Sequence, residues 1–214
     1  SARPFRTLIS IAAVFVAAIA IGMFALQYAD QPHDRVFSTQ VGGHKTITFA
    51  DGTRIELNTN TVLRARMTTR ERTIWLEKGE AYFQVKHNVT DPFIVYAGRH
   101  RVTDLGTKFL VRRDPGRLEV ALLEGRVRFG AANGDAQSAL LKPGDVATAT
   151  TGTMFVAKEN LRKLNNELSW RHGLLVFKHT TLAAAATEFN RYNRQQLIVA
   201  DPVAAQLTID GTFP

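Results

Sequence analysis

A glycine and a threonine stand side by side in VTDLGTKFLV, a stretch between two segments that read as β-strand. Gly106 is a poor strand former, and Thr107 carries a hydroxyl that becomes a nucleophile when a base accepts its proton. Asp104 and His100 are near enough in sequence to act as that base. In the simpler interpretation, Gly106 marks a β-bulge and Thr107 is an ordinary strand residue. The two residue types are compatible with both interpretations.

Other reactive side chains show no arrangement of comparable interest. The chain has no cysteine, so it contains neither a disulfide nor a thiolate metal site. The histidines lack the short spacing, with a carboxylate neighbour, that a metal site prefers: His33, His44, His87, His100, His172 and His179. A Ser-His-Asp order, paired carboxylates and a glycine-rich phosphate loop are missing as well. We therefore expect that the protein binds no cofactor and no metal ion. We also expect that it is not an enzyme acting on external substrates, with a hydrolase as a minor alternative.

A strongly apolar segment near the N-terminus predicts a membrane anchor. The run from Leu8 to Leu26 carries no charge and is long enough to cross the hydrocarbon core as a helix. A cleaved signal peptide is the alternative, but the following QYADQP is a poor match to an A-x-A cleavage site. We place the transmembrane helix at residues 8–28. Arg3 and Arg6 precede it, so residues 1–7 form a cytoplasmic flank.

This topology puts the bulk of the chain outside the cytoplasm. The net charge of +8 suggests an acidic partner, an anionic membrane surface or nucleic acid, and the external location argues against nucleic acid. The sequence starts close to the span and without an initiator methionine. We therefore expect a cytoplasmic segment before Ser1, and the half-complete tail predicts a further segment after Pro214.

Residues 29–35 read as a polar linker, and residues 36–156 read as a β-rich domain. In KTITFADGTRIEL, a three-residue loop at 50–52 would put all four apolar residues on one face: Ile47, Phe49, Ile55 and Leu57. A two-residue turn would mix the faces. We therefore predict a bulged turn with Gly52 in the left-handed conformation.

A short repeat occurs three times in this domain, and each copy reads as strand, corner and strand. The copies begin at Leu76, Leu122 and Leu141, and each has a glycine three residues later. Pro143 cannot adopt the positive φ that a tight primed turn needs, so the third copy requires a wider corner. Such corners favour a solenoid or a sandwich over a string of identical hairpins. The predicted fold is therefore mainly β, solenoid-like or sandwich-like.

The pattern changes after residue 156 and predicts a partial α/β domain at residues 157–214. AKENLRKLNNELSW places Leu161, Leu164 and Leu168 on one stripe of a helix. GLLVF and QLIVA read as strands on either side of a helix in TTLAAAATEFNRYN, which starts at a threonine cap. These elements predict a β-α-β unit, and LTIDGTF predicts a final strand.

With these pieces in order, the chain resembles the FecR family of transmembrane sigma-factor regulators, which control iron and siderophore uptake in Gram-negative bacteria. The resemblance rests on TITFADGTRIELNTNTVLRA, IWLEKGEAYFQVKHNVTDPFIVYAG, VTDLGTKFLVRRD, VALLEGRVRF and LLKPGDVAT. The tail, from WRHGLLVFKHTTLAAAATEFNRYN to LTIDGTF, resembles the short domain at the N-termini of secretins and TonB-dependent receptors.

The resemblance implies a single-pass signal transducer of the inner membrane whose bulk is periplasmic. Its expected partners are the periplasmic signalling domain of a TonB-dependent outer-membrane receptor, a cytoplasmic sigma factor bound through the missing segment, and a site-2-type intramembrane protease. In this interpretation a loaded receptor contacts the periplasmic domain, and the signal reaches the sigma factor through the membrane helix.

The resemblance also gives LGTKF a specific chemistry. Several family members resemble proteins that cleave themselves at the Gly-Thr bond of an LGTxF motif by N–O acyl shift. Here Thr107 would attack the Gly106 carbonyl, and water would open the resulting ester. Glycine leaves that carbonyl uncrowded and tolerates a strained backbone.

The last strand is the expected docking site, because an unpaired strand edge accepts a partner strand through its backbone. The residues expected to bind the partner are Leu207, Ile209, Gly211 and Phe213. Docking on the β-rich region is the alternative.

A different class of function is an envelope module that binds peptidoglycan or polysaccharide. Sugar sites need exposed aromatic platforms, and Trp75 and Trp170 fall at patterned apolar positions, which disfavours this function. In a run of arginines at positions 64, 66, 70 and 72, the first two are expected to share a solvated face of a strand, with an acidic partner or lipid headgroups as the sharper alternative.

Overall fold

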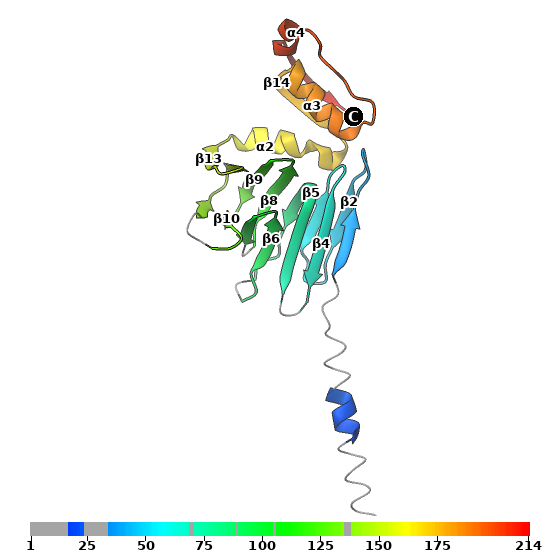
Figure 1. Ribbon diagram of the computed structural model, residues 1–214, viewed down its shortest axis with the longest axis vertical. Helices are drawn as coiled ribbons and strands as arrows, with labels where there is room; N and C mark the ends of the chain where they lie inside the picture. The colour runs from blue at the N-terminus through cyan, green and yellow to red at the C-terminus, as the bar shows by residue number, and fades with distance from the viewer. Residues whose placement is uncertain (1–16, 24–33, 69–70, 89, 105, 135–137) are drawn as a thin grey trace, which may run out of the picture. The chain divides into compact units, whose positions relative to one another are not determined.

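The computed structural model describes residues 17–23, 34–68, 71–88, 90–104, 106–134 and 138–214 (Figure 1). The chain divides into two units, Ser1–His33 and Asp34–Pro214. Residues 17–23 are helical and exposed, whereas the remainder of the predicted span and of its cytoplasmic flank lies outside the described residues. In the described part of the chain, no helix combines the length and the apolar character needed to cross a membrane.

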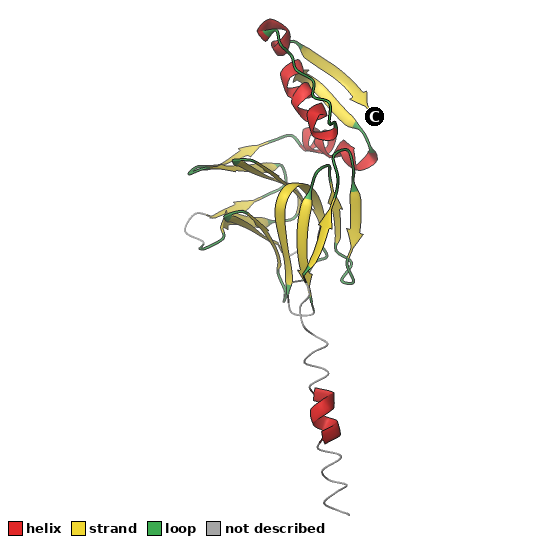
Figure 2. Ribbon diagram, turned by 45° about the vertical axis from the view of Figure 1, so that its right-hand side comes forward, coloured by secondary structure: helices red, strands yellow, loops and turns green. Residues whose placement is uncertain are grey.

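Thirteen strands of the second unit form one continuous sheet, whose two halves we call leaf 1 and leaf 2 (Figure 2). Strand β5 belongs to both leaves, and its pairing with β6 is parallel whereas the other pairings are antiparallel. In order of pairing, leaf 1 contains β1 (Arg35–Ser38), β4 (Val62–Met67), β5 (Arg72–Gln84), β6 (Phe93–Ala97), β7 (His100–Asp104), β10 (Val127–Ala131) and β11 (Ser138–Leu141). Leaf 2 contains β2 (Lys45–Thr48), β3 (Arg54–Leu57), β5, β8 (Lys108–Asp114), β9 (Arg117–Glu124), β12 (Asp145–Thr150) and β13 (Met154–Lys158).

The inward-facing side chains of both leaves form one hydrophobic core. Four fully buried phenylalanines mark its centre: Phe83, Phe93, Phe109 and Phe129. The rings of Phe83 and Phe109 stack at 4.8 Å between centroids, and Phe93 meets Phe83 edge-on at 6.0 Å. Of the two expected architectures, the structure is therefore the sandwich-like one, with a nearly closed sheet.

The predicted hairpin is confirmed. Strands β2 and β3 pair with Ile47 opposite Ile55, and Phe49 N–H donates to the Thr53 carbonyl oxygen at 2.9 Å. Residues 50–52 therefore form the three-residue loop, and Gly52 has a φ of +87°. As expected, this register buries the four apolar side chains on one face.

Each copy of the glycine repeat carries the chain from one leaf to the other. In the second copy the corner at Gly125 joins β9 to β10, and in the third Pro143-Gly144 joins β11 to β12. Three residues separate the strands at the third corner and two at the second, so the third corner is wider, as predicted. The first copy differs: Gly79 bends β5 without interrupting it, so one strand serves both leaves.

The crossings pack against one another where two glycines have no side chain. A Cβ on Gly79 would lie 2.6 Å from Thr61 Cα, in the crossing between β3 and β4. A Cβ on Gly125 would lie 3.0 Å from Thr107 Cβ, in the crossing between β7 and β8, and closer still to its methyl group. The approaches to Thr61 Cα and to the Thr107 methyl group are too short for a real side chain, so these positions require glycine.

After β13 the chain contains α2 (Leu161–Glu167), η1 (Leu168–His172), β14 (Leu175–Thr181), α3 (Leu182–Tyr192), α4 (Pro202–Gln206) and β15 (Thr208–Phe213). Asn160 caps α2, and Thr181 caps α3 as predicted. Strands β14 and β15 form a separate antiparallel pair. We call residues 161–214 the C-terminal module.

The predicted strand at residues 196–200 is wrong, and so is the β-α-β unit that included it. Leu197 and Ile198 are 56% and 85% exposed. The Asn190 side chain bonds both the N–H and the carbonyl oxygen of Leu197, at 2.6 and 2.9 Å, which takes the place of a strand partner. A short apolar run has no periodicity that distinguishes a strand from an irregular segment.

The predicted helix after residue 156 starts later than expected. Residues up to Lys158 extend β13, which pairs with β12, and the helix begins after the Asn160 cap. Leu164 and Leu168 are buried as expected, but Leu161 in the first turn is 43% exposed.

An apolar row on the outer surface of leaf 2 carries the C-terminal module. Its members in the sheet are Tyr82, Leu110, Ala121 and Val146, one from each of four neighbouring strands. Leu164, Leu168 and Trp170 belong to the same cluster as this row. Helix α2, which carries Leu164, lies over leaf 2 (Figure 1). The module is thus packed against the sandwich by a second hydrophobic cluster.

Substitution of Gly79 by alanine should strongly destabilise the sandwich, because the new Cβ meets the Thr61 backbone and alanine is strained at a φ of +87°. Gly52 has the same φ but no atom within 4 Å of an added Cβ, so Gly52→Ala measures the strain alone. We expect a loss of about 1 kcal/mol for Gly52→Ala and of about 3 kcal/mol or more for Gly79→Ala in urea unfolding. Equal losses would show that the crossings have room for a side chain.

Candidate cleavage and docking sites

Gly106 and Thr107 lie in the crossing from β7 to β8 and are not part of a regular strand. Gly106 has a φ of +138°, and its N–H donates to Asp104 Oδ1 at 3.0 Å. The Thr107 carbonyl oxygen accepts the Val85 N–H at 2.9 Å, which ties the crossing to the end of β5. Both sides of the predicted scissile bond are therefore fixed to neighbouring strands.

The Thr107 side chain is buried and its hydroxyl has no bond. Thr107 is 5% exposed, and within the described residues its Oγ1 has no hydrogen-bond partner. The methyl group faces Gly125, where a side chain would collide with it. Burial of a hydroxyl without a hydrogen bond costs about 1–3 kcal/mol.

Thr61 occupies the matching position in the other crossing and provides an internal comparison. Its hydroxyl bonds the Thr59 carbonyl oxygen at 3.0 Å and both backbone groups of Glu80 at 3.0 and 3.1 Å. Each threonine packs against a corner glycine, but only Thr107 follows a glycine and lacks a bond to its hydroxyl.

Of the two expected bases, Asp104 is at this corner and His100 is not. His100 lies at the opposite end of β7, where it stacks on Phe129 at 5.5 Å, and burial, followed by the charge of Arg99, lowers its pKa. The histidine that contacts the corner is His87, because a Cβ on Gly106 would lie 2.7 Å from His87 Nδ1. Sequence reasoning missed His87, since only the fold brings the end of β5 to this crossing.

The predicted docking strand is β15, and its two faces differ. Ile209, Gly211 and Phe213 alternate with exposed residues and are half-buried, and Phe213 packs edge-on against Phe189 of α3 at 5.4 Å. Leu207, just before the strand, is 59% exposed. Among the predicted partner-binding residues, Leu207 thus presents its side chain most openly.

Among the described strands, β15 pairs only with β14. Each strand of such a two-stranded sheet has one edge without a neighbour in the described chain. An edge of this kind offers backbone N–H and carbonyl groups to a partner strand.

A network of charged side chains joins the C-terminal module to leaf 2. Glu80 of β5 is 3% exposed and pairs with Arg191 of α3 at 2.7 Å, while Asn58 donates to its other oxygen at 2.9 Å. Arg191 also pairs with Glu188 at 2.6 Å, and Glu188 pairs with Arg112 of β8 at 3.1 Å. Burial alone would lower the pKa of Arg191, but Glu80 and Glu188 raise it above its usual value.

A second ion pair makes the same connection nearby. Arg171 of η1 forms two hydrogen bonds with the buried carboxylate of Glu56, at 2.7 and 3.0 Å. Its guanidinium also lies 3.8 Å from the ring centre of Tyr82. Bidentate pairs of this kind fix orientation as well as position.

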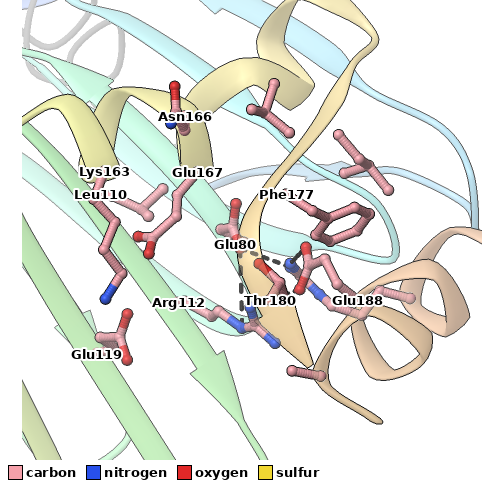
Figure 3. A pocket seen from close by; sticks show the side chains of 14 residues that line it. Glu80, Leu110, Arg112, Glu119, Lys163, Asn166, Glu167, Phe177, Thr180 and Glu188 are labelled. Carbon is pink, nitrogen blue, oxygen red and sulfur yellow. Dashed lines mark hydrogen bonds and ion pairs between the residues drawn. The ribbon is translucent and has the colours of Figure 1, made fainter. Parts of the chain in front are cut away.

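A pocket of about 290 Å³ opens beside the first network, between leaf 2, α2, β14 and α3 (Figure 3). Glu167, Glu119 and Lys163 line it on the side opposite Glu188 (Figure 3). Partial burial, followed by the charge of Glu119, raises the pKa of Glu167 to about 7. The module is therefore attached through a charged and partly open interface.

The outer surface of leaf 1 departs from expectation at Trp75. Trp170 is buried, but Trp75 faces outward and its ring stacks on Tyr96 at 6.0 Å. Arg64 and Arg66 lie over the Trp75 ring, at 4.3 and 5.3 Å. Both arginines also pair with Asp34 at 2.7 Å, so they share an outward face as predicted.

The remaining arginines of that run have different surroundings. Arg72 is only 5% exposed and bonds the backbone of Asp91 and Lys86, so it does not belong to the outward face. Arg70 lies outside the described residues.

Residues 35–128 match the family model of the FecR protein. Two crystal structures of a candidate anti-sigma factor from Parabacteroides distasonis ATCC 8503 have a similar fold. They align with TM-scores of 0.68 and 0.65 at 25% and 24% identity, and each alignment covers 84% of both chains. Among curated proteins, none matches this chain.

Removal of Arg191 should loosen the C-terminal module, because Glu80 would keep a buried charge with only Asn58 and the more distant Arg112 nearby. We expect Arg191→Met to lower the free energy of unfolding by about 3 kcal/mol in urea titration. The control is Lys163→Met, whose exposed pair with Glu159 contributes about 0–1 kcal/mol. Similar losses in both variants would mean that the buried network does not hold the module.

Proposed function

We propose that this chain is a sigma-factor regulator that senses a partner through its β sandwich and C-terminal module, because residues 35–128 match the family model of the FecR protein. The observation that carries the proposal is the family match over the sandwich, together with the related fold of the candidate anti-sigma factor. The sigma factor would bind a cytoplasmic segment that precedes the described part. No catalysis on an external substrate is required for this role.

We place the chain in the inner membrane with residues 8–28 as its anchor and the sandwich in the periplasm. The uncharged run from Leu8 to Leu26 and the preceding arginines support this placement. An intramembrane protease of the site-2 type would then cut the anchor to release the cytoplasmic segment.

The sensed partner is, in this proposal, the periplasmic signalling domain of a TonB-dependent receptor for an iron chelate. The C-terminal module supports docking there, because β15 has an edge without a neighbour in the described chain and Leu207 is exposed beside it. Its attachment through two buried carboxylates, Glu56 and Glu80, would pass a load on the module to the sandwich.

Self-cleavage at Gly106–Thr107 is the second part of the proposal. Support comes from the contrast between the crossings: the Thr61 hydroxyl is hydrogen-bonded, whereas the Thr107 hydroxyl is buried and has no hydrogen-bond partner among the described residues. A hydroxyl without a hydrogen bond can attack without first breaking one. The positive φ of Gly106 further excludes other residue types before the scissile bond.

A second candidate function is binding of an envelope polysaccharide. The outward Trp75–Tyr96 pair favours it, since stacked aromatic rings form platforms for sugars. Arg64 and Arg66 lie over the Trp75 ring, however, and so compete with a sugar for it. We therefore rank this function second.

Thr107→Val should abolish cleavage without loss of stability, because valine fills the same volume and removes a hydroxyl that has no bond. Thr107→Ser should retain cleavage, since the nucleophile remains. Denaturing gels and mass spectrometry would detect fragments that meet between Gly106 and Thr107. The stability control is Thr61→Val, which loses the bond accepted from the Glu80 N–H and the proton shared between the Thr59 and Glu80 carbonyl oxygens, and should cost about 1–3 kcal/mol. An unchanged fragment pattern in Thr107→Val would refute self-cleavage.

Leu207→Arg should weaken binding of a receptor signalling domain at least tenfold in titration calorimetry, because it places a bulky charge beside the β15 edge. Phe155→Arg, at a 54% exposed site on β13, should leave the Kd unchanged. If Phe155→Arg weakens binding and Leu207→Arg does not, the docking site lies on the β sandwich. Failure of the unaltered chain to bind any such domain at micromolar concentration would remove the receptor from the proposal.

A further inference from the structure

His87 lies against the glycine of the proposed scissile bond. Strand β5 ends at Gln84, and the bond from Val85 N–H to the Thr107 carbonyl oxygen brings the following residues past the crossing. A Cβ on Gly106 would lie 2.5 Å from His87 Cβ and 2.7 Å from its Nδ1. The histidine therefore occupies the space that a side chain at Gly106 would need.

The backbone that carries His87 is held from two sides. Lys86 N–H donates to Thr53 Oγ1 at 3.2 Å, and the Lys86 carbonyl oxygen accepts Arg72 Nη1 at 2.9 Å. Arg72 is itself buried and pairs with Asp51 at 3.3 Å. The position of His87 beside Gly106 is thus determined by the core of the sandwich and does not depend on a free loop.

His87 also differs from Thr107 in its contact with water. The His87 side chain is exposed, whereas the Thr107 hydroxyl is buried. An imidazole at this boundary can take a proton from the buried side and exchange it with solvent. Asp104 has another task, because its Oδ1 holds the Gly106 N–H and so fixes the conformation of the bond.

We propose that His87 transfers the proton during cleavage of the Gly106–Thr107 bond, an inference that rests on the self-cleavage proposed above. The two side chains share no hydrogen bond in this structure, and such bonds commonly form only as a reaction proceeds. The contact with Gly106 places the imidazole on the residue whose carbonyl carbon is attacked.

The step conserves all atoms with water as the only co-reactant. The Thr107 hydroxyl gives its proton to the unprotonated ring nitrogen of His87 as Oγ1 bonds to the Gly106 carbonyl carbon. The imidazolium then donates a proton to the Thr107 nitrogen as the C–N bond breaks, which leaves an ester and a free amine. One water molecule hydrolyses the ester to the Gly106 carboxyl group and restores the Thr107 hydroxyl.

The test follows the full-length precursor over time in cell-free translation, with denaturing gels and mass spectrometry of the fragments. We expect His87→Ala and His87→Gln to slow cleavage by about 100-fold. Added imidazole should restore part of the rate in His87→Ala, where truncation leaves space for it, and should have little effect on the unaltered chain. His100→Ala, at the far end of β7, is the matched control and should cleave at the unaltered rate.

Three outcomes distinguish failure of the role of His87 from failure of the self-cleavage proposal. Equal rates for the unaltered chain and His87→Gln would overturn the role of His87, as would a slow His87→Ala that imidazole does not accelerate. Absence of cleavage in the unaltered chain, with no fragments released by hydroxylamine, which captures esters, would overturn self-cleavage itself. Thermal unfolding checks that each variant is folded, and His87→Gln preserves most of the side-chain volume if the alanine variant unfolds.

Discussion

Close approach of backbone crossings is the constraint on which the rest of this structure depends. The chain moves repeatedly between two leaves, and two of these crossings pack glycine against threonine: Gly79 on Thr61, and Gly125 on Thr107. The leaves share one core because a missing Cβ lets two crossings pass at a distance that no side chain permits. The same packing buries a threonine hydroxyl at each place. In one crossing the backbone of Glu80 satisfies that hydroxyl, and in the other nothing among the described residues does.

Strand β5 connects the regions with proposed functions. Gly79 bends it from leaf 1 into leaf 2, and the adjacent Glu80 holds Arg191 of the C-terminal module. A few residues further on, Val85 bonds the Thr107 carbonyl oxygen and the chain continues to His87. Movement of the module would therefore act on a strand that also positions the proposed cleavage site. This is a physical connection between two regions, and evidence for coupling would require a measured effect of one on the other.

Much of the sandwich follows from local sequence, whereas the site does not. The loop ending at Gly52 could be predicted because only one register buries all neighbouring apolar residues, and the corner glycines could be predicted from their spacing. The strand predicted at residues 196–200 was wrong, and the backbone of Leu197 in this segment bonds the Asn190 side chain and not a neighbouring strand. The contacts of His87 with Gly106 and of Arg191 with Glu80 join residues that are distant in sequence. Hydrophobic periodicity along the sequence does not predict such contacts. Trp75 occupies an apolar position in the sequence pattern and was therefore expected to be buried. Its side chain instead lies on the outer surface of leaf 1, where Arg64 and Tyr96 pack against the ring.

Cleavage at Gly106–Thr107 would not by itself separate the domain. β7 precedes this bond and pairs with β10, which follows it, and β5 pairs in the same way with β8. The stacked rings of Phe83 and Phe109 come from opposite sides of the bond. The two fragments would therefore stay folded together. Strand pairing and the shared core would hold them after the peptide bond is broken. Since the proposed anchor precedes the bond and the proposed docking strand follows it, cleavage would convert a covalent connection into one that a load on β15 can break. A sensor that must respond to a partner's force has a physical use for such a bond.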